Sequence, residues 1–248
     1  MKIAEGVEML ELSMKLGGRE STIFPTLIWD DKDTILVDAG LPGELKKIQD
    51  EISKVGLNFD KIDKIIVTHQ DIDHIGGISD ILKESDHKIL VLAHKNDKPF
   101  IEGEKRLNKI TPEHRQEIEK QFKTMPEEQR KTMQALFQNP PTAKVDETLK
   151  DGLELPYCGG IIVIHTPGHT PGHICLYLKK SKTLIAGDLL HITDGELTGP
   201  NSRNTPDMDS ATTAIQKFLI YDIEQIVCYH DGLFKSNSNK KIAELTSK

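Results

Sequence analysis

Residues 65–77 read Ile-Ile-Val-Thr-His-Gln-Asp-Ile-Asp-His-Ile-Gly-Gly, and this stretch governs how the rest of the chain is interpreted. It opens with three β-branched apolar residues, which are typical of a buried strand, and it continues into a helix-like segment. Four side chains that can bind a metal ion lie where the strand gives way to the helix: His69, Asp71, Asp73 and His74. Two imidazoles and two carboxylates at one point suit a pair of borderline or hard divalent cations. The stretch therefore predicts a metal site at the end of a strand.

Three later stretches place further ligand-type residues where a strand is expected to end. The first, residues 165–173 (His-Thr-Pro-Gly-His-Thr-Pro-Gly-His), follows an apolar run, and its two Pro-Gly pairs predict tight turns. The second is Ala186-Gly187-Asp188, and the third is Tyr229-His230-Asp231-Gly232. A simpler interpretation of the opening stretch is a polar loop in which Asp73 caps a helix, but it does not explain this repetition. Because sites in α/β proteins gather at the carboxyl ends of strands, the four stretches together favour one site.

The composition narrows the class of protein. The chain has 248 residues, of which 37% are hydrophobic and 29% charged, an ordinary profile for a soluble domain with a real core. Its net charge of -7 argues against nucleic acid as the main partner, because phosphate binding draws on clustered Lys and Arg. Cys158, Cys175 and Cys228 match no CxxC spacing and are expected to be reduced thiols. With no signal-like start and no apolar run of membrane-spanning length, the sequence predicts a cytoplasmic protein without a membrane partner.

Strand-like and helix-like segments alternate along the chain. The periodicity predicts helices at residues 43–55 and 209–219. It predicts strands at 22–29, 34–37, 64–68, 87–93, 161–164, 174–178, 183–186 and 225–228, with the first two paired as a hairpin. This alternation is typical of the α/β class.

Residues 99–141 interrupt this pattern, because they contain no convincing strand. One helix is expected to begin at Thr111-Pro112 and a second at Pro126, and Asn139-Pro140-Pro141 would end the second. We therefore expect a helical insertion within a single domain that covers residues 1–248. The insertion is predicted to form a lid or wall over the metal edge, with a dimer contact as the alternative.

Taken together, these motifs resemble the metallo-β-lactamase superfamily. Asp38-Ala39-Gly40 is similar to its first motif, residues 69–74 are similar to its HxHxDH motif, and single His, Asp and His residues follow late in the chain. The resemblance covers residues 20–232 outside the insertion, and the combination is specific although each piece alone is weak. It implies a four-layer αβ/βα sandwich, in which two mixed sheets face each other, helices lie outside and metals sit at one edge.

The resemblance also implies two metal positions. The first would be held by His69, Asp71 and His169, the second by Asp73, His74 and His230, and Asp188 would bridge them. Asp38 would hold the ligand loop in place from behind. The implied cofactors are two divalent metal ions, with zinc expected and iron or manganese as alternatives.

Asp71 departs from the family pattern, because it stands where HxHxDH has its second histidine. Flavodiiron proteins are similar in carrying a glutamate there, and oxygen ligands favour harder cations such as iron and manganese. Three carboxylates and a bridging hydroxide would neutralise two divalent ions, whereas a histidine at position 71 would leave one net positive charge. A neutral site acidifies its water less. The alternative is that Asp71 points away and only caps the following helix.

The implied activity is hydrolysis of a small ester, lactone or thioester by a metal-activated water, with Asp73 passing a proton to the leaving group. His191 is a second catalytic candidate, because lactonases of the superfamily often carry a substrate-contacting tyrosine near that place. His173 and His165 are expected to be structural. The expected partner is a small-molecule substrate, and a homodimer is left open.

Four other functions are considered. A phosphodiesterase or nuclease could use the same metals but would need a basic groove, which is not visible. A redox protein of the flavodiiron kind would need a flavodoxin-like domain. A non-catalytic ligand-binding member is kept open by Asp71. A true β-lactamase is disfavoured, since such enzymes are exported and no export signal is seen.

Overall fold

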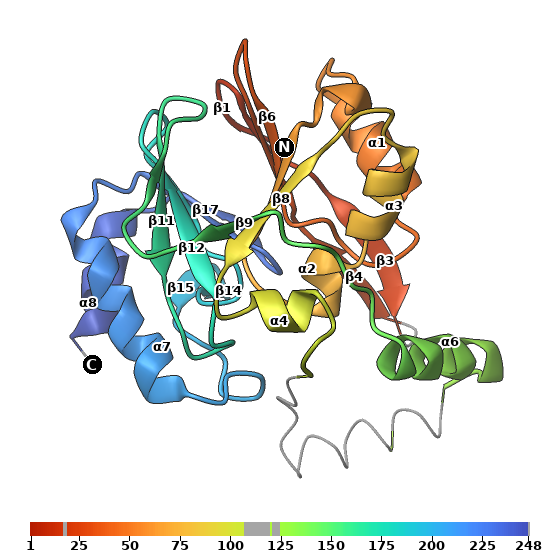
Figure 1. Ribbon diagram of the computed structural model, residues 1–248. Coiled ribbons are helices and arrows are strands. Elements are labelled where there is room, and N and C mark those ends of the chain that lie inside the picture. Colours follow the sequence, from red (N-terminus) through yellow and green to blue (C-terminus); the bar gives the residue numbers. More distant parts are fainter. Residues whose placement is uncertain (17–18, 107–119, 121–124, 248) are drawn as a thin grey trace.

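Two mixed β-sheets face each other, and helices cover their outer sides (Figure 1). The computed structural model describes residues 1–16, 19–106, 120 and 125–247. The first sheet has seven strands in the order β1 (Lys2–Ala4), β2 (Val7–Met9), β5 (Thr26–Trp29), β6 (Thr34–Val37), β7 (Lys64–Val67), β8 (Leu90–His94) and β9 (Glu147–Leu149). The second has six in the order β10 (Glu154–Leu155), β11 (Ile161–His165), β12 (Ile174–Leu178), β13 (Thr183–Ile185), β16 (Gln225–Cys228) and β17 (Gly232–Phe234). The predicted four-layer αβ/βα sandwich is confirmed.

Strand β7 shows how an apolar sequence produces these layers. Successive side chains of a strand point to opposite faces. Ile66 joins the core between the two sheets, whereas Ile65 and Val67 pack beneath the outer helices. Because both faces of the strand are covered, all three positions must be apolar, and all three are fully buried.

Helices form the two outer layers. On the first sheet lie α1 (Leu45–Lys54) and α3 (Ile78–Glu84), which contribute Ile48, Ile52 and other side chains to the core there. On the second lie α7 (Met208–Ala214), the 3₁₀ segment η2 (Ile215–Ile220) and α8 (Ser238–Thr246). Among the described helices, none is long and apolar enough to cross a bilayer.

Three sequence predictions need correction. The strand predicted at 22–29 is broken at Pro25, which has no N–H to donate, so only β5 pairs with β6, and β4 (Arg19–Ile23) forms a separate ribbon with β3 (Leu12–Leu16). The strand predicted at 87–93 begins later, because His87 lies in a turn in which its Nε2 bonds Ile62 O at 2.8 Å. The helix predicted at 209–219 becomes 3₁₀ from residue 215.

The short elements β14 (His191–Thr193) and β15 (Glu196–Thr198) were not predicted, nor were β1, β2, β17 and α8. Strands of three residues carry too little periodicity to be recognised, and they form here because a neighbouring strand satisfies their backbone groups.

The insertion leaves the first sheet after β8 and returns to the same sheet at β9. Its ends are tied together, because Ala143 N donates to Ile101 O at 3.0 Å and Lys98 Nζ donates to Val145 O at 3.1 Å. Its described helices are α4 (Lys98–Ile101) and α6 (Glu127–Gln138), and α6 agrees with the helix predicted from Pro126. The helix predicted at Thr111 lies outside the described residues. The role of the insertion as a lid stays a prediction.

Parallel pairing brings the ligand-type residues to one edge of the sandwich. Strands β6, β7 and β8 run parallel to one another, and β13 runs parallel to β16. Their carboxyl ends lead into Asp38, the 69–74 stretch, Asp188 and His230. The two sheets also touch here, since Ile174 N donates to Thr68 O at 3.0 Å.

Gly77 lets the Asp38-Ala39-Gly40 turn pack against the segment that carries His69, Asp71, Asp73 and His74. A Cβ at this position would lie 2.2 Å from the carbonyl oxygen of Ala39, which is backbone and cannot swing aside. We predict that Gly77→Ala lowers the free energy of unfolding by about 1–3 kcal/mol through overpacking. Gly199→Ala is the control, because its new methyl group would meet only Ile215 Cδ1 at 3.7 Å. Urea unfolding of both variants measures the difference, and equal stabilities would contradict the prediction.

Candidate metal centre

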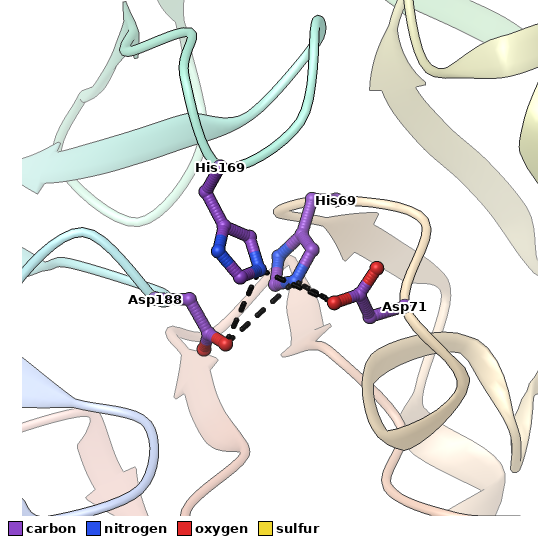
Figure 2. Close-up of side chains that lie close together, drawn as sticks. All are labelled: His69, Asp71, His169 and Asp188. Carbon is purple, nitrogen blue, oxygen red and sulfur yellow. Dashed lines mark hydrogen bonds and ion pairs between the residues drawn. The ribbon is translucent and has the colours of Figure 1, made fainter. Parts of the chain in front are cut away.

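Seven side chains from both sheets converge in two adjacent groups at this edge. The first group is His69, Asp71, His169 and Asp188, and the second is Asp73, His74 and His230. Within each group the ligand atoms all lie within 4.8 Å of one another. Figure 2 shows the first group, with side chains from three separate loops pointing at one another. The grouping is the one implied by the sequence resemblance, and the assignment as metal ligands stays a prediction.

Asp188 lies between the two groups. Its Oδ2 is 3.4 Å from His169 Nε2 in the first group and 3.2 Å from His230 Nε2 in the second. Its Oδ1 is 3.2 Å from His74 Nε2. Oδ2 therefore faces both groups at once, which is the bridging position expected of Asp188.

The side chain of Asp71 turns into the first group. Its Oδ2 is 3.2 Å from His169 Nε2 and 3.4 Å from His69 Nε2. Asp71 is the N-cap residue of the short helix α2 (Ile72–Ile75), yet its side chain makes no capping hydrogen bond. The geometry therefore disfavours the capping alternative and supports a ligand role.

Several buried polar atoms at the centre have no hydrogen-bond partner among the described residues. They include His69 Nε2, His74 Nε2 and Asp188 Oδ1, of which the last two lie 3.2 Å apart without making a hydrogen bond. A buried polar atom left unsatisfied costs about 1–3 kcal/mol, so three together call for a ligand that binds imidazole nitrogen and carboxylate oxygen. Divalent metal ions have that preference, and the residues present fit them.

Asp38 supports the centre from behind, as predicted. Its carboxylate accepts from Thr68 N at 2.8 Å, from Thr68 Oγ1 at 2.7 Å and from His74 Nδ1 at 2.9 Å. Since the Thr68 hydroxyl donates to Asp38, it accepts from His69 Nδ1 at 3.1 Å. Both histidines thus hold a proton on Nδ1, which leaves Nε2 as the ring nitrogen that faces the site. Asp38 reaches this position with a φ of 61°, an uncommon conformation for a residue other than glycine.

His173 is structural, as expected. Its Nε2 accepts from the backbone N–H of Asp188 at 3.1 Å, so its Nδ1 carries the proton and donates to Thr166 Oγ1 at 2.7 Å. Burial lowers the pKa of His173 well below its usual value, which keeps the ring neutral and able to accept. His165 packs against His94 with ring centroids 4.0 Å apart, also as expected.

Burial and nearby carboxylates act in opposite directions on the ligand-type histidines. Burial lowers the pKa of His69 well below its usual value. Burial would also lower the pKa of His74, but Asp38, Asp188 and Asp73 outweigh it and raise that pKa well above its usual value. A metal ion binds only the deprotonated ring, so an ion at His74 must displace a proton, and binding should weaken as the pH falls.

His191 lies outside both groups. Its Nδ1 is 3.0 Å from Asp231 Oδ2, which also accepts from Ile192 N at 3.2 Å. Its Nε2 is buried and has no hydrogen-bond partner among the described residues. A catalytic role for His191 stays a prediction.

Two residues of the site were missed by the sequence analysis. Tyr229 stacks on the His74 ring with centroids 3.8 Å apart, and its hydroxyl donates to Asp73 O at 2.5 Å. The sequence signal that could have identified Tyr229 is its position directly before the ligand candidate His230. Asp97 joins two ligand loops through hydrogen bonds but belongs to no motif, so nothing in the sequence identified it.

Comparison with known proteins agrees with this geometry. Residues 19–230 match the sequence profile of the metallo-beta-lactamase superfamily. The probable metallo-hydrolase YflN of Bacillus subtilis is 28% identical over 223 residues, which cover 79% of this chain and 74% of that protein. The hydroxyacylglutathione hydrolase GloC of Haemophilus influenzae is 28% identical over 167 residues, covering 66% of this chain and 65% of that protein. A crystal structure of a metallo-beta-lactamase family protein from Thermus thermophilus superposes with a TM-score of 0.71 at 21% identity, over 99% of this chain and 80% of that one, and supports the fold.

Asp71 is best tested by two substitutions studied side by side. We predict that Asp71→Asn weakens the first metal position and lowers the bound metal below that of the unaltered protein after dialysis, because a charged ligand is lost. Asp71→His should restore binding. It should also shift the acidic limb of the pH–rate profile to lower pH, because a more positive centre lowers the pKa of its water. Metal analysis and pH–rate profiles measure both effects. An Asn variant with full metal content and an unshifted profile would show that Asp71 is not a ligand.

Proposed function

We propose, because the chain belongs to the metallo-β-lactamase superfamily, that this metallo-hydrolase cleaves a small ester, lactone or thioester at a centre of two divalent ions. The observation that supports the proposal is the place of Asp188, whose Oδ2 lies 3.4 Å from His169 of the first group and 3.2 Å from His230 of the second, as a ligand shared by two ions would. Two ions bound there would polarise a carbonyl group and supply a nucleophilic water at neutral pH. We propose zinc first, with iron and manganese as alternatives because of the oxygen ligand at Asp71.

The second ligand group is the side of the centre that is open to solvent. The side chains of Asp73 and His230 are 31% and 30% exposed, whereas those of His69, His74 and His169 are fully buried. A substrate therefore reaches the second group from solvent. Asp73 is the most exposed of the three carboxylates at the centre, so it is placed to take up a proton and pass it to the leaving group.

A thioester is the first substrate class to test. The relative from Haemophilus influenzae is named as a hydrolase of hydroxyacylglutathione, an acyl conjugate of a thiol. Its similarity extends over two thirds of this chain, so it supports a choice among substrates without deciding it. The net charge of -7 adds no support for a nucleic acid.

A hydrolysis screen tests the proposed function. Freshly purified protein would be assayed with acyl-glutathione thioesters, lactones, p-nitrophenyl esters and bis(p-nitrophenyl) phosphate. We predict that a thioester or lactone has the highest kcat/KM, that chelation abolishes the activity and that zinc or manganese restores it. Fastest cleavage of the phosphodiester would instead favour a phosphodiesterase, and activity that survives complete metal removal would overturn the proposed centre.

His191 is the proposed contact to the substrate carbonyl oxygen. Asp231 accepts from Nδ1, so a contact from Nε2 to the carbonyl oxygen requires the imidazolium form of His191, in which both ring nitrogens donate. We predict that His191→Ala lowers kcat/KM by about 100-fold while the metal content stays unchanged, because only a transition-state hydrogen bond is lost. His87→Ala is the control, since His87 lies in the turn before β8 and bonds Ile62 O. Loss of metal from His191→Ala, or a kcat/KM equal to that of the control, would contradict this role.

A further inference from the structure

One buried carboxylate outside both ligand groups reaches the loops that carry them. Asp97 lies between β8 and α4 and is 1% exposed. Its Oδ2 accepts from the backbone N–H of Gln70 at 3.2 Å and from the hydroxyl of Thr170 at 2.6 Å. Its Oδ1 accepts from the backbone N–H of Gly172 at 2.6 Å. The side chain of Asp97 thus joins the loop after β7, in the first sheet, to the loop between β11 and β12, in the second.

The anchor points of Asp97 flank ligands of the first group alone. Gln70 stands between His69 and Asp71 in the sequence, and Thr170 directly follows His169. The amide of Gln70 also donates to Asp71 Oδ1 at 3.0 Å. The second group is supported differently, because His74 bonds Asp38.

Asp97 packs so closely against Gly172 that a side chain at position 172 would not fit. A Cβ on Gly172 would lie 2.5 Å from Asp97 N and 2.8 Å from Asp97 Cβ. Beside it, Asn96 Nδ2 donates to Pro171 O at 3.2 Å. Asn96 and Asp97 therefore contact the consecutive residues Pro171 and Gly172. Because Asp97 also bonds Gln70, this contact sets the distance between the loop of Gln70 and the loop of Gly172.

The chemistry of the contact requires a carboxylate. Three donors converge on two oxygens, and an ionised carboxylate only accepts. An asparagine would have one accepting oxygen, so either orientation of its amide would set an NH₂ group against the N–H of Gly172 or of Gln70. The substitution keeps the shape of the side chain and removes one side of the contact.

We propose that Asp97 is a positioning residue for the first metal position, which holds the two loops at the separation at which His69, Asp71 and His169 bind the same ion. The inference rests on the proposed dinuclear centre and adds that different carboxylates position the ligands of its two metal positions. Asp97 bonds only the loops that carry the first position, whereas Asp38 bonds His74 of the second position directly and reaches His69 only through Thr68.

The test measures metal affinity at each position separately. His230→Ala removes a ligand of the second position and leaves the first to be titrated alone, and His169→Ala does the reverse. Zinc binding to each background would be measured by competition with a chromophoric chelator, with and without Asp97→Asn. We predict that Asp97→Asn raises the Kd about 10–100-fold in the His230→Ala background, the range seen for outer partners of ligands, and much less in the His169→Ala background.

Two further comparisons separate positioning from general stability. Asp146→Asn alters a carboxylate that accepts from Val91 N at 3.1 Å beside β9 and touches neither ligand loop, so it should leave both affinities unchanged. Thr170→Val removes the donor at nearly constant shape, and it should bind the first ion more weakly than Thr170→Ser, which keeps the hydroxyl.

The outcomes distinguish this inference from the proposed function. A selective loss at the first position supports it. Equal weakening at both positions, or none at either, overturns it while leaving the dinuclear centre in place. Unaltered protein that binds neither zinc nor iron nor manganese would overturn the centre and this inference with it.

Discussion

Thr68 connects the two sheets and both ligand groups. Its carbonyl accepts from Ile174 of the second sheet, and its N–H and hydroxyl both donate to Asp38 at the end of β6. Its hydroxyl also accepts from His69, whose other ring nitrogen faces the site. Thr68 is fully buried, so each of these groups must be satisfied within the protein. That requirement sets the separation of the sheets at this edge and the orientation of the histidines.

The charges at the centre explain why so much of the structure is devoted to orientation. Three carboxylates and four imidazoles crowd together, and most are shielded from water. Burial lowers the pKa of His69, whereas the carboxylates around His74 outweigh its burial and raise its pKa. Buried groups of this kind are costly unless they are paired or bind a metal. The folded scaffold therefore holds these side chains in a costly arrangement that bound divalent ions would relieve.

Much of the fold and of the candidate site could be predicted from local sequence. The run at 65–67 required a strand covered on both faces, and the ligand candidates could be named because they stand where such strands end. Pairings between distant segments could not be predicted in this way. The return of the chain to the first sheet at β9, the break at Pro25 and the stacking of Tyr229 on His74 depend on neighbours that sequence spacing does not specify.

Asp71 and Asp97 show this division most clearly. Spacing alone makes Asp71 a ligand candidate, because its distance along the chain from His69 and His74 matches a known pattern. Its choice between capping α2 and facing His169 depends on the folded chain, since His169 lies 98 positions away. For Asp97 no local pattern exists. Its hydrogen bonds join two loops that only the packing of one sheet on the other brings together, and a hydrogen bond forms only where geometry places donor and acceptor within about 3 Å.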